Sequence, residues 1–224
     1  KISNTGGRNA TAYSYIEKAR YAVGLYLNRH HINCVAVDLS GNVISLIRVR
    51  ENFDLNDDNY LRKIGETVEE VKKDTGLSDD RFLGVGIAVQ GLISDDGERV
   101  TYGLTLNFTG VTRADIAKYI PYHNRLFHDS AAAGYAEVWD RNDLDDAFYL
   151  SLSNSVGGAV IVANKIFEGE RRKSGEIGHM TIIPKAGDRC YCGQRGCFDT
   201  VCRANVLAEY ADGDLEKFFE LLET

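Results

Sequence analysis

The spacing of apolar and polar residues predicts that the chain opens with a run of β-strands. Three β-rich segments separated by short turns should pair as an antiparallel meander: Tyr21–Leu27, Ile32–Asp38 and Val43–Val49. Apolar residues then recur every three or four positions from Leu61 to Val71, which indicates a helix that ends at Gly76. Phe82–Val89 is apolar on both faces, as expected of a strand in the centre of a sheet.

Strands and helices alternate in the second half of the chain. Thr112-x-x-Asp115 resembles a capping box at the start of a short helix that runs to Ile120. The other expected elements are a strand at Leu126–Phe127, a helix at Ser130–Trp139, strands at Ala147–Leu152 and Ala159–Val162 around a turn at Gly157-Gly158, and helices at Asn205–Tyr210 and Leu215–Leu222. This order predicts an α/β fold with a mixed sheet. The arrangement resembles the lobes of the actin-like ATPase (ribonuclease H-like) superfamily.

Composition agrees with a globular protein and narrows its partners. The 224 residues are 44% hydrophobic and 26% charged, which is enough apolar material to form a core. Lys and Arg total 26 and Asp and Glu total 33, so the net charge of −7 makes this segment a poor binder of nucleic-acid phosphates. No run approaches the ~20 apolar residues of a membrane span, and the N-terminus has no signal-peptide core. These features predict a cytoplasmic protein with no membrane partner.

Four of the five cysteines lie between positions 190 and 202, which favours a metal site over a framework of disulfide bonds. Three of them and one histidine fit a closed, structural Zn²⁺ shell: His179, Cys190, Cys192 and Cys197. Gly193 and Gly196 would allow the backbone to wrap closely around the ion. Cys202 is expected in the core rather than as a fifth ligand. The alternative is a set of ordinary buried cysteines beside a core histidine.

The run Gly-Glu-Ile-Gly-His at 175–179, followed after ten residues by Cys-x-Cys-Gly-x-x-Gly-Cys, resembles the signature of the ROK family. That family groups bacterial sugar-responsive repressors with sugar kinases. The similarity extends over nearly the whole chain, and Thr5-Gly6-Gly7-Arg8 resembles the junction between a DNA-binding winged helix-turn-helix and a sugar-binding domain. The resemblance implies a linker at 1–19, an N-terminal α/β lobe at 20–125, and the start of a second lobe at 126–224 with the zinc loop at 175–203. It also implies that the DNA-binding module and the rest of the second lobe lie outside this sequence.

A sugar kinase of this kind would use Asp129 as general base, and here His128 replaces the asparagine that precedes the base in the family's kinases. Asp129 could also simply be a helix N-cap. The two phosphate-binding loops are degenerate. The first hairpin, residues 26–31, has no glycine, and the second, residues 153–158, keeps only its last two glycines. Because glycines let backbone N–H groups reach phosphates, we expect no ATP use and no enzyme activity.

The resemblance implies sugar contacts at six positions: Asn107, His128, Asp129, Glu176, His179 and Asp199. His179 would present one ring nitrogen to zinc and the other to a sugar hydroxyl. Asp199 stands where the family has glutamate and is one methylene shorter. Asn107 is the weaker match to a family asparagine. For Asp199 and Asn107 a capping or turn role is equally open, and Glu176 could be a solvated loop carboxylate.

These observations favour the sugar- or sugar-phosphate-sensing domain of a ROK-type transcriptional regulator. Such a regulator would be a homodimer or homotetramer and would contact operator DNA only through residues outside this chain. The alternative is a zinc-containing, ATP-dependent sugar kinase. A third reading treats the cysteine loop as an independent zinc ribbon for nucleic acid or protein. Against it, the loop and its flanks carry only four basic residues: Lys185, Arg189, Arg195 and Arg203.

Overall fold

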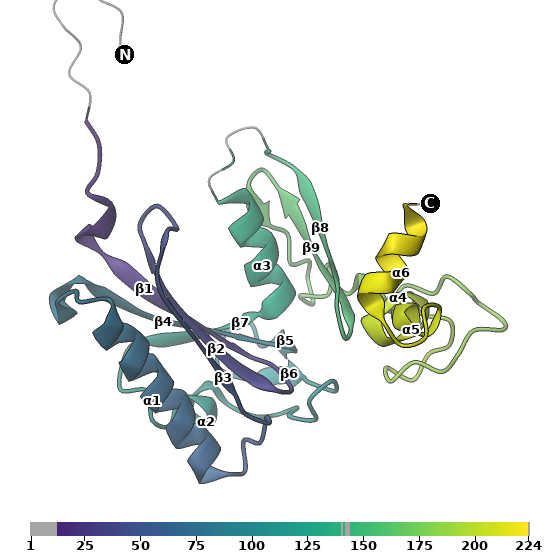
Figure 1. Ribbon diagram of the computed structural model, residues 1–224, viewed down its shortest axis with the longest axis horizontal. Helices are drawn as coiled ribbons and strands as arrows, with labels where there is room; N and C mark the ends of the chain where they lie inside the picture. The colour runs from purple at the N-terminus through teal and green to yellow at the C-terminus, as the bar shows by residue number, and fades with distance from the viewer. Residues whose placement is uncertain (1–12, 140, 142–143, 224) are drawn as a thin grey trace, which may run out of the picture.

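A computed structural model describes residues 13–139, 141 and 144–223 (Figure 1). Of the linker expected at 1–19, residues 1–12, including Thr5-Gly6-Gly7-Arg8, lie outside the described residues. Residues 13–19 contain one short 3₁₀ helix, η1 (Glu17–Ala19). The first strand therefore begins two residues after that turn of helix, at Tyr21.

The first half of the chain forms a five-stranded sheet with the order β3-β2-β1-β4-β7. Its strands are β1 (Tyr21–Leu27), β2 (His31–Asp38), β3 (Val43–Arg50), β4 (Phe82–Val89) and β7 (Asn124–His128). The first three strands pair antiparallel, which confirms the predicted meander, whereas β4 pairs parallel with both β1 and β7. The sheet is therefore mixed, as predicted, and β4 lies between two parallel neighbours.

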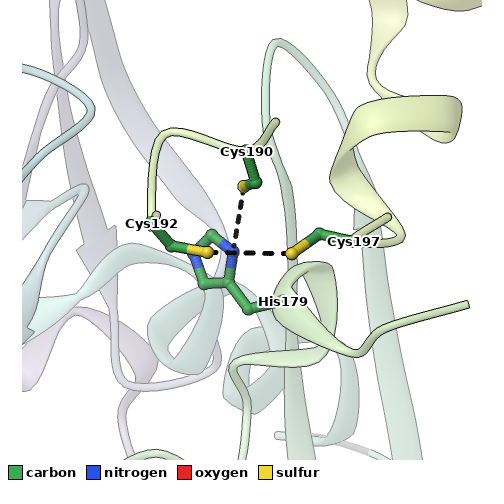
Figure 2. Close-up of side chains that lie close together, drawn as sticks. All are labelled: His179, Cys190, Cys192 and Cys197. Carbon is green, nitrogen blue, oxygen red and sulfur yellow. Dashed lines mark hydrogen bonds between the residues drawn. The ribbon is translucent and has the colours of Figure 1, made fainter. Parts of the chain in front are cut away.

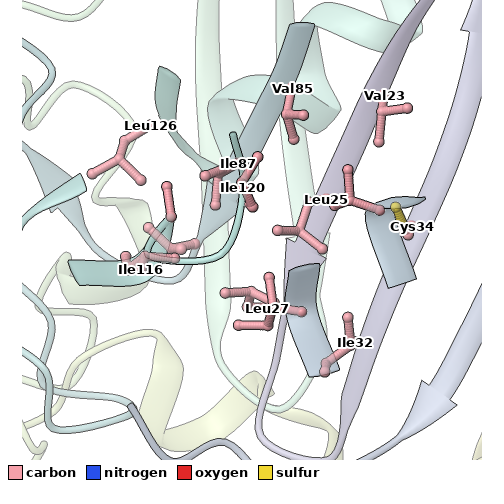
Figure 3. Packing of buried hydrophobic residues seen from close by; sticks show 14 of the residues in the cluster. Val23, Leu25, Leu27, Ile32, Cys34, Val85, Ile87, Ile116, Ile120 and Leu126 are labelled. Atoms are coloured by element: carbon pink, nitrogen blue, oxygen red, sulfur yellow. The ribbon is translucent and has the colours of Figure 1, made fainter. Parts of the chain in front are cut away.

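Helix α1 (Asp58–Asp74) lies along one face of this sheet and closes the main core (Figure 1). The Asp57 side chain caps its first turn by accepting from the Asn59 N–H, and Gly76 follows its end in the left-handed conformation, φ 65°. Every second residue of β1 is buried. Figure 3 shows how side chains from neighbouring strands, such as Leu25, Ile87 and Leu126, point into one apolar cluster.

Several short elements connect α1 to β7. The predicted capping box at Thr112 and Asp115 is present, with each side chain bonded to the other residue's backbone N–H. This capping box opens α2 (Arg113–Ile116), which is shorter than the predicted helix: it ends at Ile116, whereas the prediction ran to Ile120. Three further elements were not predicted, because they are too short to show a periodic pattern of apolar residues: η2 (Asp79–Arg81), β5 (Leu92–Ile93) and β6 (Val100–Tyr102).

The second half begins with helix α3 (Asp129–Val138), which packs on a three-stranded sheet of order β10-β9-β8 (Figure 1). These strands are β8 (Ala147–Leu152), β9 (Val156–Val162) and β10 (Lys165–Ile166). The expected turn at Gly157-Gly158 is wrong, because both glycines lie inside β9. They are required there by close packing: a Cβ at Gly157 would collide with the Ser130 hydroxyl, and one at Gly158 with the Ile177 side chain.

The chain ends in short helices around the cysteine-rich loop. They are η3 (Ile177–His179), α4 (Asp199–Cys202), α5 (Ala204–Glu209) and α6 (Leu215–Leu222). The last two match the predicted helices to within one residue, whereas α4 is too short to produce a periodic pattern. The expected lobe division between residues 125 and 126 falls inside β7, which pairs with β4 and so completes the first sheet.

No helix in the described part of the chain is long and apolar enough to cross a membrane.

We predict that Gly65→Ala destabilises the protein by about 1–3 kcal/mol, the usual cost of overpacking. Gly65 lies in α1, and a Cβ there would approach the Tyr119 carbonyl oxygen to 2.5 Å. In an open helix the same change would stabilise by ~1 kcal/mol. Urea denaturation measures the effect, with the exposed helical position Glu70→Ala as control, which should change stability by less than ~0.5 kcal/mol. A more stable Gly65→Ala protein would contradict the packing argument.

Candidate functional site

A small polar cavity of about 90 Å³ lies at the edge of the first sheet, beside α3 and the β8–β9 turn. Its position follows from the topology. Strands β1, β4 and β7 run parallel, so their carboxyl ends meet at one edge, where α/β folds commonly bind ligands. Tyr26, Gln90 and His128 enter the cavity from these three strand ends, and Asp129 follows directly. Glu176 and His179 reach it from the second half of the chain.

Four titratable side chains form a row along the cavity. His128 Nε2 lies 3.6 Å from Asp129 Oδ1 and 3.9 Å from Glu176 Oε1, and His179 Nε2 lies 3.8 Å from Glu176 Oε2. Burial raises the pKa of Asp129 above its usual range, although the neighbouring His128 and the Ser130 N–H oppose the shift. Carboxylate oxygens and ring nitrogens in such a row can accept and donate paired hydrogen bonds to a polyhydroxylated ligand.

Asp129 is the first residue of α3, and the N-cap is His128, which makes no side-chain capping bond. The Asp129 Oδ1 instead accepts the Ser130 N–H at 2.8 Å. Its carboxylate thus binds the positive end of the helix while it lines the cavity. The alternative reading of Asp129 as an N-cap is therefore wrong in position, since the residue lies one place further along.

Two of the six predicted sugar-contact residues do not line the cavity. Asn107 is exposed and adopts φ 55° in a turn in which its N–H donates to the Leu104 carbonyl oxygen. Asp199 is 0% exposed, and its Oδ1 accepts the Val156 N–H at 2.7 Å. Asp199 Oδ2 is also buried and has no hydrogen-bond partner in the described structure. Asn107 thus lies in a turn, one of the roles left open by the sequence, whereas the Asp199 side chain bonds the backbone at the start of β9.

The cavity also has polar lining residues that the sequence analysis did not assign to it. Gln90 donates from Nε2 to the Tyr26 hydroxyl at 3.2 Å. Burial, and then the charge of Asp129, raises the pKa of Tyr26 to about 12. The Tyr191 ring stands edge-on to His179 with centroids 5.0 Å apart. The position of Tyr26 and Gln90 at the ends of predicted strands was a usable signal, whereas nothing in the sequence marked Tyr191.

The four predicted metal ligands come together, with all their donor atoms within 4.8 Å of one another (Figure 2). Zn–S bonds of ~2.3 Å and Zn–N bonds of ~2.0–2.1 Å in a tetrahedron give S–S and S–N separations of about 3.8 and 3.5 Å. The Cys192 and Cys197 sulfurs are 3.7 Å apart, and Cys190 Sγ is 3.5 Å from His179 Nδ1. The cluster could therefore hold a tetrahedral metal ion, and Cys202 is not part of it.

The loop is shaped for such an ion. Gly193 and Gly196 adopt φ 93° and 69°, and a Cβ at Gly196 would collide with the Ile183 carbonyl oxygen. Burial raises the pKa of the Cys190 thiol to about 12, and it raises that of Cys197 as well. A bound cation would supply the positive charge that keeps such buried sulfurs as thiolates.

In the hairpin between β1 and β2, a side chain of the protein bonds two of the backbone N–H groups. The Asn28 side-chain oxygen accepts both the His30 N–H, at 3.0 Å, and the His31 N–H, at 2.9 Å. Arg29 turns its guanidinium to the Thr105 carbonyl oxygen, at 2.7 Å. Two backbone donors of this hairpin, the N–H groups of His30 and His31, are therefore bonded within the protein and not free for a phosphate.

A second, larger cavity of about 740 Å³ lies beside the polar one and shares His128 and Glu176 with it. Most of its wall is apolar and comes from β7, α3 and β9, with residues such as Phe127 and Ala131. An apolar wall offers a sugar few hydrogen-bond partners. The smaller cavity, where the polar groups converge, is therefore the candidate site.

A family model described as the ROK family matches residues 22–219. The chain belongs to the ROK family. This ROK chain is 27% identical over 210 residues to the xylose repressor of Bacillus subtilis (strain 168). The alignment covers 91% of this chain and 53% of the repressor. It is also 22% identical over 195 residues to the glucokinase of Halalkalibacterium halodurans. That alignment covers 86% of this chain and 59% of the glucokinase. The chain spans about half the length of the curated relatives it matches.

Solved ROK structures share its fold. A ROK family transcriptional regulator described as a homologue of the E. coli MLC protein superposes with a TM-score of 0.71 at 22% identity, covering 87% of this chain and 49% of that one. The ROK glucokinase from Streptomyces griseus, in complex with glucose and AMPPNP, gives 0.71 at 20% identity, covering 88% and 68%. The predicted actin-like ATPase fold is confirmed. The relatives include both repressors and kinases.

We predict that Cys192→Ser lowers metal retention, since it removes one donor from a four-donor shell. Affinity for Zn²⁺ should fall at least 10–100-fold, the range seen even for changes around a metal's ligands. Metal content after dialysis against a weak chelator, measured by atomic emission, tests this. Cys202→Ser is the matched control and should retain about one ion per chain. Equal loss in both variants would show that the four-residue cluster is not the metal site.

Proposed function

We propose that this chain is the sugar-sensing part of a ROK-type transcriptional regulator. The observation that carries the proposal is the combination of a polar cavity with a first hairpin in which a side chain already bonds two backbone donors. The cavity has the groups that hold a sugar, whereas the Asn28 side chain fills the hairpin where a nucleotide phosphate would lie. Similarity to the xylose repressor supports the same conclusion.

The proposed sugar contacts are the four predicted residues that line the cavity: His128, Asp129, Glu176 and His179. Carboxylates accept two hydroxyl hydrogen bonds at once, and each ring nitrogen can accept or donate one. Asn107 lies outside the lining, and Asp199 supports the cavity from behind through Val156. We therefore assign direct contacts to the first four and a supporting role to Asp199.

The proposed metal is Zn²⁺, held by His179 and the three cysteines. When bound it supplies a closed structural centre that fixes the loop and offers no open position to a substrate. His179 faces Cys190 with Nδ1 and the cavity with Nε2. This geometry supports a coupling between the order of the loop and the shape of the sugar site. It also argues against the loop as an independent zinc ribbon.

Signalling would follow from the position of the cavity, which residues from both halves of the chain line. A ligand that contacts both halves and binds one arrangement of them better shifts the population toward that arrangement. That shift would be transmitted to DNA-binding residues outside this chain, in a homodimer or homotetramer.

The alternative function is a sugar kinase, for which a specific observation exists. Asp129 lies at the carboxyl end of β7 with a raised pKa, as a general base requires, and glucokinases are among the relatives. Catalysis would also need positioned donors around the transferred phosphoryl group. The occupied hairpin donors count against this reading.

We predict no ATP turnover above background in a coupled ADP-release assay across common hexoses, pentoses and amino sugars. The reason is the loss of phosphate positioning, which a well-placed base alone cannot replace. Asp129→Asn serves as the internal control, because it removes the only proposed base. Sugar-dependent ADP release that disappears in Asp129→Asn would establish the kinase and remove the sensor-only reading.

We also predict that chelation abolishes the rise in melting temperature caused by a bound sugar. Without the ion His179 is no longer fixed, so one wall of the cavity loses its position. Differential scanning fluorimetry would compare zinc-loaded, chelated and zinc-restored protein, with circular dichroism to verify that the first sheet stays folded. An unchanged sugar-induced shift in metal-free protein would disprove the coupling through His179.

A further inference from the structure

The two halves of the chain face each other across the polar cavity. Tyr102 and Thr105, at and just after the end of β6, line it from the first half, and Tyr191 of the cysteine-rich loop lines it from the second. Burial raises the pKa of Tyr102, and the nearby Cys192 raises it further. The segment 102–105 and the cysteine-rich loop are therefore neighbours at this site.

Residues of the candidate metal cluster surround Tyr191. It lies between Cys190 and Cys192 in sequence, and its ring stands edge-on to His179 with the centroids 5.0 Å apart. The Gly193 N–H closes the turn by donating to the Cys190 carbonyl oxygen at 3.0 Å. Tyr191 is nevertheless 42% exposed, more than a tyrosine that serves mainly to fill a core. Its position is set by the loop, and its side chain faces the cavity.

Thr105 is braced from the first half of the chain. Its carbonyl oxygen accepts the Arg29 guanidinium at 2.7 Å, which ties this segment to the β1–β2 hairpin. A backbone bond from the Phe108 N–H to the Gly103 carbonyl oxygen, at 2.9 Å, closes the turn around it. The backbone of Thr105 is thus held in place, while its residue lines the cavity.

The Tyr191 hydroxyl and the Thr105 side chain lie next to each other between these two supports. Burial raises the pKa of Tyr191, and the neighbouring Thr105 side chain opposes that shift. Each of the two hydroxyls can both donate and accept a hydrogen bond. A bond between them would connect the first half of the chain to the second beside the cavity that both residues line.

We propose that Tyr191 and Thr105 form a latch, a hydrogen bond between their hydroxyl groups that joins the two halves around a bound ligand and slows its release. The inference rests on the proposed sugar-sensing function and adds the way in which that site closes. A ligand held between the halves favours their closed arrangement. The latch stabilises the same arrangement, so ligand and latch strengthen each other.

The rival explanation is a purely structural role, in which the Tyr191 ring only supports His179 through the edge-on contact. Tyr191→Phe separates the two explanations, because it keeps the ring and removes the hydroxyl alone. Thr105→Val likewise keeps a branched side chain and removes the hydroxyl. If the ring is all that matters, both variants will bind ligand as the unaltered chain does.

The experiment is a double-mutant cycle on sugar affinity, measured by isothermal titration calorimetry with xylose, glucose and N-acetylglucosamine as probes. For the sugar that binds, we expect Tyr191→Phe and Thr105→Val each to weaken affinity about 2–10-fold, the usual effect of one hydrogen bond. The double variant should bind no more weakly than either single variant, because the same bond is lost only once. Tyr210→Phe, at a position 73% exposed just after α5, is the control and should bind like the unaltered chain.

Unchanged affinity in Tyr191→Phe, or losses that add up in the double variant, would overturn the latch and leave the sugar-sensing function standing. No binding of any of the three sugars by the unaltered chain would overturn both.

Hydrogen exchange provides a second measurement, independent of the size of the affinity change. The bound sugar should slow exchange in segments 103–107 and 189–193 together, since the latch links them, and Tyr191→Phe should reduce the protection of both. Protection confined to one segment would contradict the latch. This comparison can be made on the unaltered chain, so it still decides the matter if a variant fails to fold.

Discussion

The His179 imidazole lies between the candidate metal cluster and the candidate ligand cavity. Its Nδ1 lies 3.5 Å from the Cys190 sulfur, and its Nε2 lies 3.8 Å from the Glu176 carboxylate. One planar ring therefore contacts the metal cluster on one edge and the ligand cavity on the other. In the proposed sensor, a structural ion that orders the cysteine loop would also orient this wall of the cavity, and so influence ligand binding without chemistry of its own.

Side chains of the protein itself bond backbone N–H groups at three places where a phosphate could otherwise bind. The Asn28 amide fills the first hairpin, Asp129 fills the N-terminus of α3, and Asp199 holds the start of β9. Each contact meets the requirement that backbone donors be bonded. Together they bond backbone N–H groups at three positions where a fold of this kind can bind a phosphate.

The candidate site was predictable where its signals are local in sequence. The metal ligands are close together and carry glycines where the backbone must turn, so their spacing alone indicated the cluster that Figure 2 shows. Glu176 and His179 were proposed from the motif at 175–179, and Asp129 from its place between a predicted strand and a predicted helix. Tyr26 and Gln90 could have been inferred from their place at strand ends. Tyr191 could not, because only the folded loop brings its ring against His179.

The sequence by itself determined the elements whose periodicity is strong, and the bounds of β1, β4, β8 and α6 agree with it to the residue. The tertiary structure alone decided what approaches what. Gly157 and Gly158 suggested a turn, but α3 and η3 press so closely on β9 that the strand itself requires glycine. Asp199 matched a ligand position, yet its bond to Val156, 43 residues away, holds it behind the cavity. Local patterns record backbone preference, whereas such long-range contacts exist only once the chain has packed.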